Sequence, residues 1–409
     1  MPDTLVFKNC VIFDGINEEL IRGKALVVAD GKIERICAED ETFDGCRVFD
    51  LGGAFVSPGF IDCHMHMLLE EVTVDKNRAL TTFSAGGEAY PNADSAAAYL
   101  GVDNCRKMLQ AGFTTVMDGG GRNFIDCALR EAIQKDFVSG PNYLISGKQL
   151  TTNKAHFVGF SLEPYGPWGM RKAIRDLMWW SVDFVKMQLS PPIRMVGRNS
   201  NATDFTQEEI NAAIEEAHNY GVPVHAHLRG AESIKKFLRA GGDFVVHGTG
   251  MDDECIEMML KGNQIMLPTL LSPTPNPSPE MLAAKPKTVV DLLAKTAQTH
   301  WESAKRAYKA GVPMAFSTDC GTLGNHIGTN ALEFKNLIAI GMTPVEALRA
   351  ATSVAARVTG MDDKIGAIRQ GYQADLTILN GNPLENIDAV FNVKMTLVKG
   401  KIRYCQDWQ

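Results

Sequence analysis

Eight short apolar runs alternate with helical patterns through the middle of the chain, between residues 58 and 361. Such runs are typical of buried strands, and the segments between them carry apolar residues at helical spacing. The predicted strands end, in order, at His64, Met117, Ser146, Met187, His227, His247, Leu270 and Thr318. Helices are expected at residues 95–111, 123–136, 169–178, 207–220, 231–240, 252–261, 286–310 and 344–359. Eight strand–helix units predict an α/β fold with a (β/α)8 TIM barrel; a doubly wound open sheet is the alternative.

Both ends of the chain have a different pattern, in which apolar and polar residues alternate with a period of two. Residues 5–36 read as short strands with a hairpin turn at Asp30-Gly31, and residues 374–404 read the same way with a turn around Gly400. Two β-rich ends around a different middle predict one small β-sandwich domain assembled from residues 1–57 and 362–409. Residues 58–361 would then form the barrel.

Composition and charge exclude several classes of protein. The 409 residues are 45% apolar with a net charge of −7, so neither disorder nor a basic nucleic-acid-binding surface is indicated. No apolar run approaches the ~18 residues of a membrane span, and the first residues lack the pattern of a signal peptide. The nine cysteines are scattered without a C-x-x-C pair. We therefore expect a cytoplasmic protein with reduced thiols, without membrane or nucleic-acid partners.

Histidines gather where the predicted strands end. His64, His66, His227 and His247 all lie at carboxyl ends of strands, and Asp319 follows the eighth strand in Phe316-Ser-Thr-Asp319. Residues two apart on a strand face the same side, and the carboxyl ends of barrel strands form the active-site face. One buried histidine is usually a core residue, but four at one rim predict a metal site. By parity alone, His225 is as good a ligand as His227.

Lys186 ends the fourth strand among apolar residues. Burying a lysine as a cation is costly and lowers its pKa. In one interpretation the side chain extends to solvent or pairs with Asp183. In the other, its neutral amine has taken up carbon dioxide, and the resulting carbamate is an anionic ligand that can bridge two cations.

These residues together resemble the amidohydrolase superfamily. The resemblance rests on Pro58-Gly-Phe-Ile-Asp-Cys-His64-Met-His66, the strand-four lysine, the strand-five and strand-six histidines, the strand-eight aspartate and the closing run that begins at Gly366. It covers essentially the whole chain. Within the superfamily, His227-Leu-Arg-Gly-Ala-Glu232, His247-Gly248 and residues 341–352 are most similar to the prolidase-like and ochratoxin-hydrolysing branch.

The resemblance implies a two-metal, carboxylated-lysine centre and selects His227 over His225. One ion would bind His64, His66 and Asp319, and the other would bind His227 and His247, with carboxylated Lys186 between them. Two divalent ions are expected, with zinc as the default. The ions would share a hydroxide that attacks the substrate, while Asp319 accepts its proton and passes it to the leaving nitrogen.

The implied reaction is hydrolysis of a C–N amide bond in a small molecule, with a dipeptide or N-acyl amino acid as the favoured substrate. Opening of a cyclic amide, as in hydantoin- or imidazolone-type rings, is the alternative. Deamination is less favoured, because such relatives have a glutamate where this chain has Gly230. A non-catalytic scaffold is least favoured, since all six ligand positions are filled. The resemblance also implies a homo-oligomer.

Substrate contacts are expected from the loops after the strands. His156 is a candidate catalytic residue that would hydrogen-bond the substrate carbonyl; a surface position is the alternative. Tyr165 and Trp168 lie in a turn-rich segment that would serve as a lid, and His326 would line the pocket. Arg229 would grip a substrate carboxylate, with a salt bridge to Glu232 as the alternative. Two further histidines on helical patterns, His218 and His300, are expected to face solvent.

Overall fold

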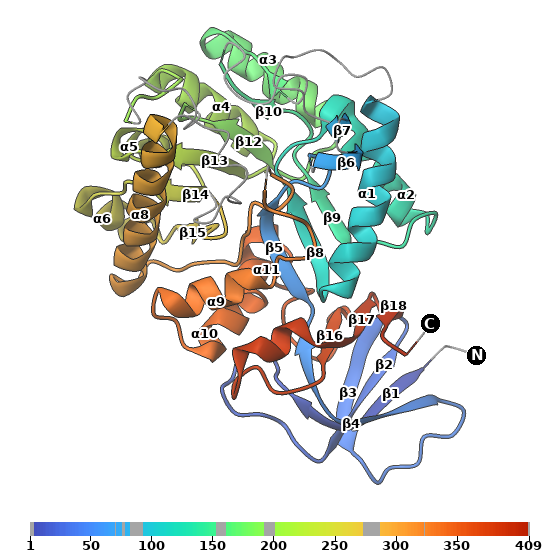
Figure 1. The fold of residues 1–409 in the computed structure, drawn as a ribbon. Coiled ribbons are helices and arrows are strands. Elements are labelled where there is room, and N and C mark those ends of the chain that lie inside the picture. Colours follow the sequence, from blue (N-terminus) through green and yellow to red (C-terminus); the bar gives the residue numbers. More distant parts are fainter. Residues whose placement is uncertain are drawn as a thin grey trace.

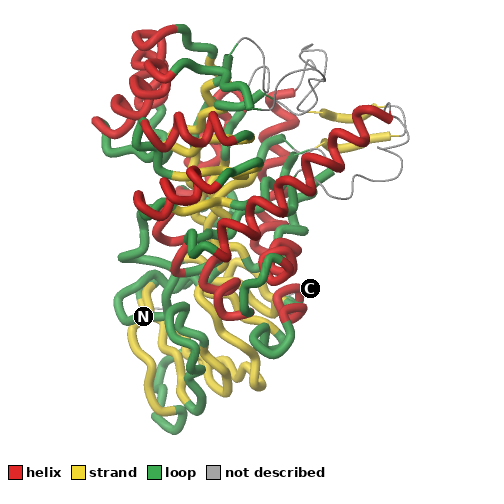
Figure 2. Tube along the Cα trace, turned by 90° about the vertical axis from the view of Figure 1, so that its left-hand side faces the viewer, coloured by secondary structure: helices red, strands yellow, loops and turns green. Residues whose placement is uncertain are grey.

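The computed structural model describes residues 4–69, 71–75, 78–81, 93–152, 161–191, 201–272, 287–322 and 324–407. His156 lies outside these residues. Figure 1 shows an α/β body above a smaller β region that contains both chain ends. Figure 2, turned by 90°, shows strands running through the middle of the body with helices around them.

The β region is one seven-stranded sheet built from both ends of the chain. Its strands, in spatial order, are β18 (Lys401–Cys405), β17 (Val393–Val398), β16 (Leu376–Leu379), β4 (Arg47–Pro58), β1 (Leu5–Ile12), β2 (Lys24–Ala29) and β3 (Lys32–Ala38). Asp30 and Gly31 join β2 to β3 with φ values of 50° and 76°, as the predicted hairpin requires. The composite origin of this region is confirmed. The described strands pair in a single sheet, whereas a sandwich would need two.

The body contains parallel strands in two sheets. One sheet holds β5 (Phe60–Met65), β8 (Phe113–Asp118) and β9 (Asn142–Ile145). The other runs β11 (Ser161–Leu162), β10 (Gln149–Leu150), β12 (Val185–Gln188), β13 (Val224–Arg229), β14 (Phe244–Thr249) and β15 (Ile265–Leu267). A separate antiparallel pair consists of β6 (Glu71–Asp75) and β7 (Arg78–Thr81). The predicted α/β class is confirmed; the closed ring of a barrel is not shown by this pairing.

The eighth predicted strand makes fewer contacts than expected. Its residues form only an isolated bridge, between Met314 and Met266. The backbone nevertheless lies between the two sheets, because Ala315 N donates to Met266 O at 3.0 Å and Cys63 N donates to Phe316 O at 2.9 Å. The two sheets also meet at a second seam, where Asp183 N, just before β12, donates to Ile145 O on β9 at 2.8 Å. Both seams therefore have backbone hydrogen bonds without a full ladder.

Helices connect most of these strands. They are α1 (Ala93–Gln110), α2 (Ile125–Gln134), α3 (Gly166–Trp179), α4 (Gln207–Asn219), α5 (Ala231–Arg239), α6 (Asp253–Gly262), α8 (Lys287–Lys309), α9 (Leu332–Ala339), α10 (Pro344–Ala350) and α11 (Ser353–Thr359), with short 3-10 turns η1 (Arg122–Phe124) and η2 (Ile387–Phe391). The single helix predicted at 344–359 is wrong. It divides at Thr352, whose φ of −129° and ψ of −95° are not helical.

Apolar side chains from the body strands converge in one inner cluster. Its members on the strands, or on the residues beside them, include Ile61, Cys63, Met117, Leu144, Phe184, Val246, Leu267 and Ala315. Since side chains on a strand alternate between faces, Lys186 and Gln188 lie on the same face of β12 as Phe184. The inner cluster thus forms an apolar layer below the carboxyl ends of the strands, where the polar residues lie.

Two expectations about the whole chain can be compared with the structure. Among the described residues, no helix has the length and apolar character needed to cross a membrane. All nine cysteines are described and free, and seven of them are buried. Most of the thiols are thus small residues of the core.

Candidate metal centre

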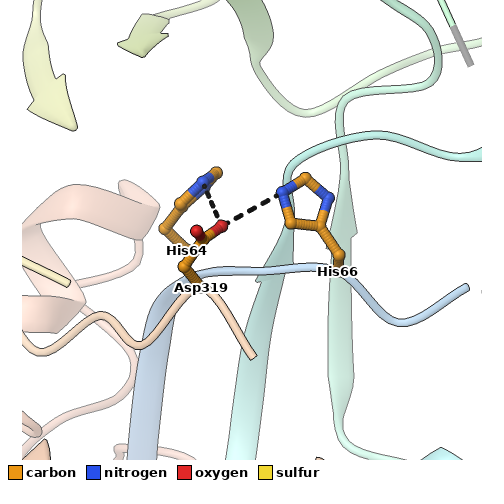
Figure 3. A group of neighbouring side chains, drawn as sticks. All are labelled: His64, His66 and Asp319. Carbon is orange, nitrogen blue, oxygen red and sulfur yellow. Dashed lines mark ion pairs between the residues drawn. The ribbon is translucent and has the colours of Figure 1, made fainter. Parts of the chain in front are cut away.

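Three predicted ligands meet where β5 ends. His64 Nε2 and His66 Nε2 lie 3.4 and 3.3 Å from Asp319 Oδ1, and all three side chains are buried. Figure 3 shows both imidazoles directed at this carboxylate. Their potential ligand atoms lie within 4.8 Å of one another. Ligands at ~2.0–2.1 Å from one tetrahedral zinc ion are about 3.4 Å apart, so the three residues fit a metal.

Asp319 is ionised in this arrangement. Burial is the largest single effect and raises the pKa of this carboxyl, but hydrogen bonds with His64 and His66, together with electrostatic interactions with His247 and His64, outweigh it and hold the pKa well below its ordinary value. A charged carboxylate at neutral pH is the form that binds a cation or accepts a proton.

Asp62, two residues before His64 on β5, connects the end of β5 to the segment that carries Asp319. Its carboxylate accepts from Thr318 Oγ1 at 2.6 Å, from Asn330 Nδ2 at 2.8 Å and from His64 N at 3.2 Å. Burial raises the pKa of Asp62 to about 7 against the effect of these hydrogen bonds. Backbone contacts add to the clamp, since Asp319 N donates to His64 O at 2.7 Å. Asp62 therefore holds the end of β5 against the residues that carry Asp319.

Gly119, just after β8, packs directly against both histidine rings. A Cβ at this position would lie 2.5 Å from Cε1 of His64 and 3.1 Å from Cε1 of His66. The first distance is far below van der Waals contact, so any other residue here would displace the rings. The absence of a side chain on β8 is part of what positions the pair.

His227 and His247 form a second pair on the neighbouring strands. His247 Nε2 lies 2.9 Å from His227 Nδ1. His247 has a φ of +69°, which is rare outside glycine, and the register of β13 with β14 shifts at this point. The irregular backbone turns the His247 side chain toward His227. Two nitrogens this close are suited to share one cation.

Thr269 determines which nitrogen of His247 is available. Thr269 Oγ1 lies 2.6 Å from His247 Nδ1 and donates its own proton to Pro268 O at 2.8 Å. It therefore accepts from Nδ1–H, which leaves the lone pair of His247 on Nε2, beside His227. Such a fixed tautomer is typical of a histidine that binds a metal.

The same segment orients Asp319. Ser272 Oγ donates to Asp319 Oδ2 at 2.6 Å, leaving Oδ1 toward the histidines. The segment is held by buried Glu333, which accepts from Leu270 N at 2.7 Å and from Leu271 N at 2.8 Å. Residues 268–272 thus orient two predicted ligands through one anchor on α9.

Lys186 lies within the cluster and is fully buried. Its Nζ is 3.0 Å from His64 Nε2. Burial lowers the pKa of Lys186 to about 7, although the charge of Asp319 opposes the shift. The alternatives of solvent exposure and pairing with Asp183 are wrong, because Asp183 pairs with Arg130 at 2.9 Å. The amine of Lys186 therefore loses its proton near neutral pH.

This burial has a measurable cost. The pKa of Lys186 falls from 10.5 in the unfolded chain to about 7 in the fold, so between these values the unfolded chain binds more protons and stability rises with pH. We expect Lys186→Met to raise the free energy of unfolding of the metal-free protein by about 2–4 kcal/mol near pH 7, a gain that shrinks toward pH 10.5. Urea denaturation with chelator at several pH values measures this. Exposed Lys172→Met is the control, and a destabilised Lys186→Met would contradict the prediction.

His225 is separated from the cluster. Its ring packs between Phe184, with ring centroids 4.4 Å apart, and Phe244, at 4.8 Å. Neither ring nitrogen has a hydrogen-bond partner in the described part of the chain, and burial lowers the pKa of His225 well below its ordinary value. His225 therefore packs in the apolar layer below the strand ends, whereas His227 contacts His247.

Arg229 lies beside the second histidine pair. Its Nε donates to His227 Nε2 at 3.3 Å, and its Nη1 is buried without a hydrogen-bond partner among the described residues. Burial lowers the pKa of Arg229 to about 10, so the side chain keeps its charge at neutral pH. The alternative salt bridge to Glu232 is not among the ion pairs of the described chain. A buried guanidinium with an unpaired N–H group is unfavourable unless a further partner satisfies it.

Other predicted contacts are not brought to the cluster. Tyr165 and Trp168, at the start of α3, are 67% and 81% exposed, and His326 is exposed in its loop. The expectation that His300 faces solvent is wrong. It is fully buried, with Nδ1 2.7 Å from Thr249 Oγ1. Spacing could have shown this, because His300 lies on one helical stripe with Ala304 and Ala307. His218 does lie at the surface, beside Asp243.

Comparisons with known proteins show which family and which solved structures the chain resembles. The sequence pattern of the Amidohydrolase family matches residues 55–403, and that of the NagA composite domain matches residues 6–56. Ochratoxinase from Aspergillus niger is 27% identical over 423 residues, covering 93% of this chain and 83% of the relative. Imidazolonepropionase from Chromobacterium violaceum is 25% identical over 412 residues, covering 93% and 91%. A crystal structure of a Xaa-Pro dipeptidase with methionine bound in its active site has a TM-score of 0.86 at 26% identity, covering 98% of this chain and 100% of that one.

Proposed function

This chain belongs to the amidohydrolase family, and we propose that it hydrolyses the C–N amide bond of a small molecule with a free carboxylate, either a dipeptide or an N-acyl amino acid. The observation that carries the choice of substrate is the buried, partly unpaired guanidinium of Arg229 beside the histidines. Similarity to ochratoxinase and to a Xaa-Pro dipeptidase that holds an amino acid supports amide hydrolysis.

The proposal includes two divalent ions, with zinc as the default. His64, His66 and Asp319 would hold one, and His227 and His247 would hold the other, because each set places its donor atoms at separations that one ion can span. When bound, the ions would activate a water for attack and polarise the scissile carbonyl. Thr269 fixes the tautomer of His247 in the second set, and Ser272 orients Asp319 in the first, so both sets would present ligand atoms to an ion.

Lys186 would complete the centre as a carbamate. Its neutral Nζ forms a bond to the carbon of CO2 and loses a proton, giving an anionic group with two oxygens. Burial favours the neutral amine that this reaction needs. The position of Nζ, 3.0 Å from His64 Nε2, supports a ligand role between the two sets.

Asp319 would carry the proton. Its carboxylate is ionised and buried, so it can accept a proton from the attacking water and deliver it to the leaving nitrogen. Ser272 keeps Oδ2 in one orientation during both steps.

We also infer that the parallel strands close as a (β/α)8 barrel of residues 58–361, with residues 1–57 and 362–409 forming the second domain. The hydrogen bonds at both seams support closure. So does the inner cluster, to which strands of both sheets contribute.

Opening of a cyclic amide is the second candidate. It is favoured by the similarity to an imidazolonepropionase, which covers 93% of this chain. The orientation of the metal-site residues is compatible with either reaction. The substrates tested therefore have to include hydantoins and imidazolones.

Replacing Arg229 tests the proposed substrate class. With the metal-loaded enzyme, Arg229→Ala is expected to raise KM for dipeptides and N-acyl amino acids about tenfold to hundredfold, because a charge-assisted hydrogen bond is lost. Neutral amides of the same acyl groups should change far less. Arg229→Lys keeps the charge but not the planar fork, and metal content is measured for every variant. Equal effects on charged and neutral substrates, or faster turnover of cyclic ureides, would overturn the proposal.

A further inference from the structure

Two glutamines lie buried beside the cluster, one at the start of β10 and one at the end of β12. Gln149 and Gln188 are 0% and 2% exposed, and Gln188 Nε2 donates to Gln149 Oε1 at 2.5 Å. The other two amide atoms, Gln149 Nε2 and Gln188 Oε1, have no hydrogen-bond partner in the described part of the chain. The pair therefore presents one unpaired donor group and one unpaired acceptor.

This balance does not depend on how the amides are oriented. Exchanging nitrogen and oxygen in both side chains reverses the bond between them. One NH2 group and one carbonyl oxygen are still left over. Burying such groups without partners is unfavourable, so the free atoms need a partner that enters the site.

The pair is part of the same rim as the predicted ligands. Gln188 lies two residues after Lys186 on the same face of β12, and its ladder partner on β13 is His227. Gln149 lies near Gly120, because a Cβ placed on Gly120 would be 3.7 Å from Cδ of Gln149. The preceding residue, Gly119, packs against His64 and His66. The glutamines thus flank the cluster next to β8 and β12.

Arg229 lies on β13, next to the strand that carries Gln188, and contacts His227. It pairs with Thr249 on β14, and Thr249 contacts His300 on α8. A substrate whose carboxylate binds Arg229 and whose scissile bond lies over the cluster can extend its acyl part to the glutamines, because the strand partner of Gln188 is His227, which Arg229 contacts. This step rests on the proposed function.

We propose that Gln149 and Gln188 bind a second, neutral amide on the acyl side of the scissile bond. An amide offers one carbonyl oxygen and one N–H, which match the free NH2 and carbonyl of the pair. A free ammonium offers only donors and would leave the NH2 group unpaired next to a cation. The preferred substrate is then an N-acylated dipeptide rather than a dipeptide with a free amino terminus.

A set of three substrates that share one leaving amino acid tests this. N-acetylalanyl, alanyl and isobutyryl derivatives differ in whether the acyl part carries an amide, an ammonium or only a methyl group. The metal-loaded wild type should favour the N-acetylalanyl compound over both others in kcat/KM by at least about tenfold. Gln149→Met and Gln188→Met should each reduce that preference by about tenfold or more.

Gln264→Met is the matched control. Gln264 also has an unpaired amide oxygen, but it lies at the start of β15, where its Nε2 donates to Gly242 O at 3.1 Å. It should keep the wild-type preference. An unchanged preference in both site variants, or none in the wild type, would overturn the proposal and assign the free amide atoms to interior water.

A binding measurement separates this proposal from the proposed reaction. The acyl products N-acetylalanine and isobutyrate are titrated into the metal-loaded wild type by calorimetry. N-acetylalanine should bind at least about tenfold more tightly, and Gln188→Met should remove the difference. If no carboxylated amide is hydrolysed but this difference is present, the proposed reaction fails while the amide site stands. Equal affinities would overturn the amide site.

Discussion

Replacing Lys186 with alanine is expected to lower kcat for amide hydrolysis by about a thousandfold, and millimolar formate or acetate is expected to restore part of the activity. The substitution removes the amine whose carbamate would be the anionic ligand next to His64. It also leaves a buried space of about the length of the lysine side chain. A short carboxylate can enter this space and supply two oxygens where the proposed carbamate would place them. Steady-state rates with and without added carboxylate, together with metal content per chain, measure the effect.

Lys186→Met is the matched variant for this experiment. Methionine fills much of the same space with apolar atoms, so it should be as inactive as alanine and should not respond to carboxylates. The same variant is expected to be more stable without metal, which separates loss of function from loss of folding. If Lys186→Ala kept full activity and held a single tightly bound metal ion, the two-metal proposal would be wrong.

Replacing Asp319 with asparagine is expected to have an effect at least as large, about a thousandfold or more on kcat. Asparagine has nearly the same shape and can still accept the hydrogen bond from Ser272, so the fold should be retained. It lacks the charge that attracts a cation and the basicity needed to take up a proton. Turnover, thermal stability and metal content are measured together.

Ser272→Ala is the control for Asp319. It removes only the hydrogen bond to Oδ2, so it should lower kcat by about tenfold while leaving metal content close to wild type. Retention of more than a tenth of wild-type turnover by Asp319→Asn would contradict the role of Asp319 in proton transfer.

Most of the predicted ligands could be found in the sequence because they lie toward the ends of apolar strands. His64, His227 and Lys186 end apolar runs, and strand ends of parallel sheets meet at one edge. The position of His225 was ambiguous by parity, and only the resemblance selected His227. In the structure the difference is depth, since His225 packs among phenylalanines below the rim.

The residues that orient the ligands could not be found in the same way. Thr269 has a φ of +46°, and no periodic pattern indicates where such a backbone turns a side chain. Glu333 acts across more than sixty residues of sequence, through backbone groups of residues 270 and 271. Gln149 lies on a strand of only two residues. These positions depend on tertiary contacts that a single sequence does not display.

The composite sheet has a consequence for how the chain is synthesised and folded. β4 has β1 as one neighbour, available early, but its other neighbour, β16, leaves the ribosome only after the whole α/β body. Until then one edge of β4 has no partner, which is a condition that favours aggregation. The body begins and ends at one place, because Gly59 N donates to Asp375 O at 2.8 Å. A nascent chain can thus fold the body as a closed loop, and the last strands then seal the sheet from which it started.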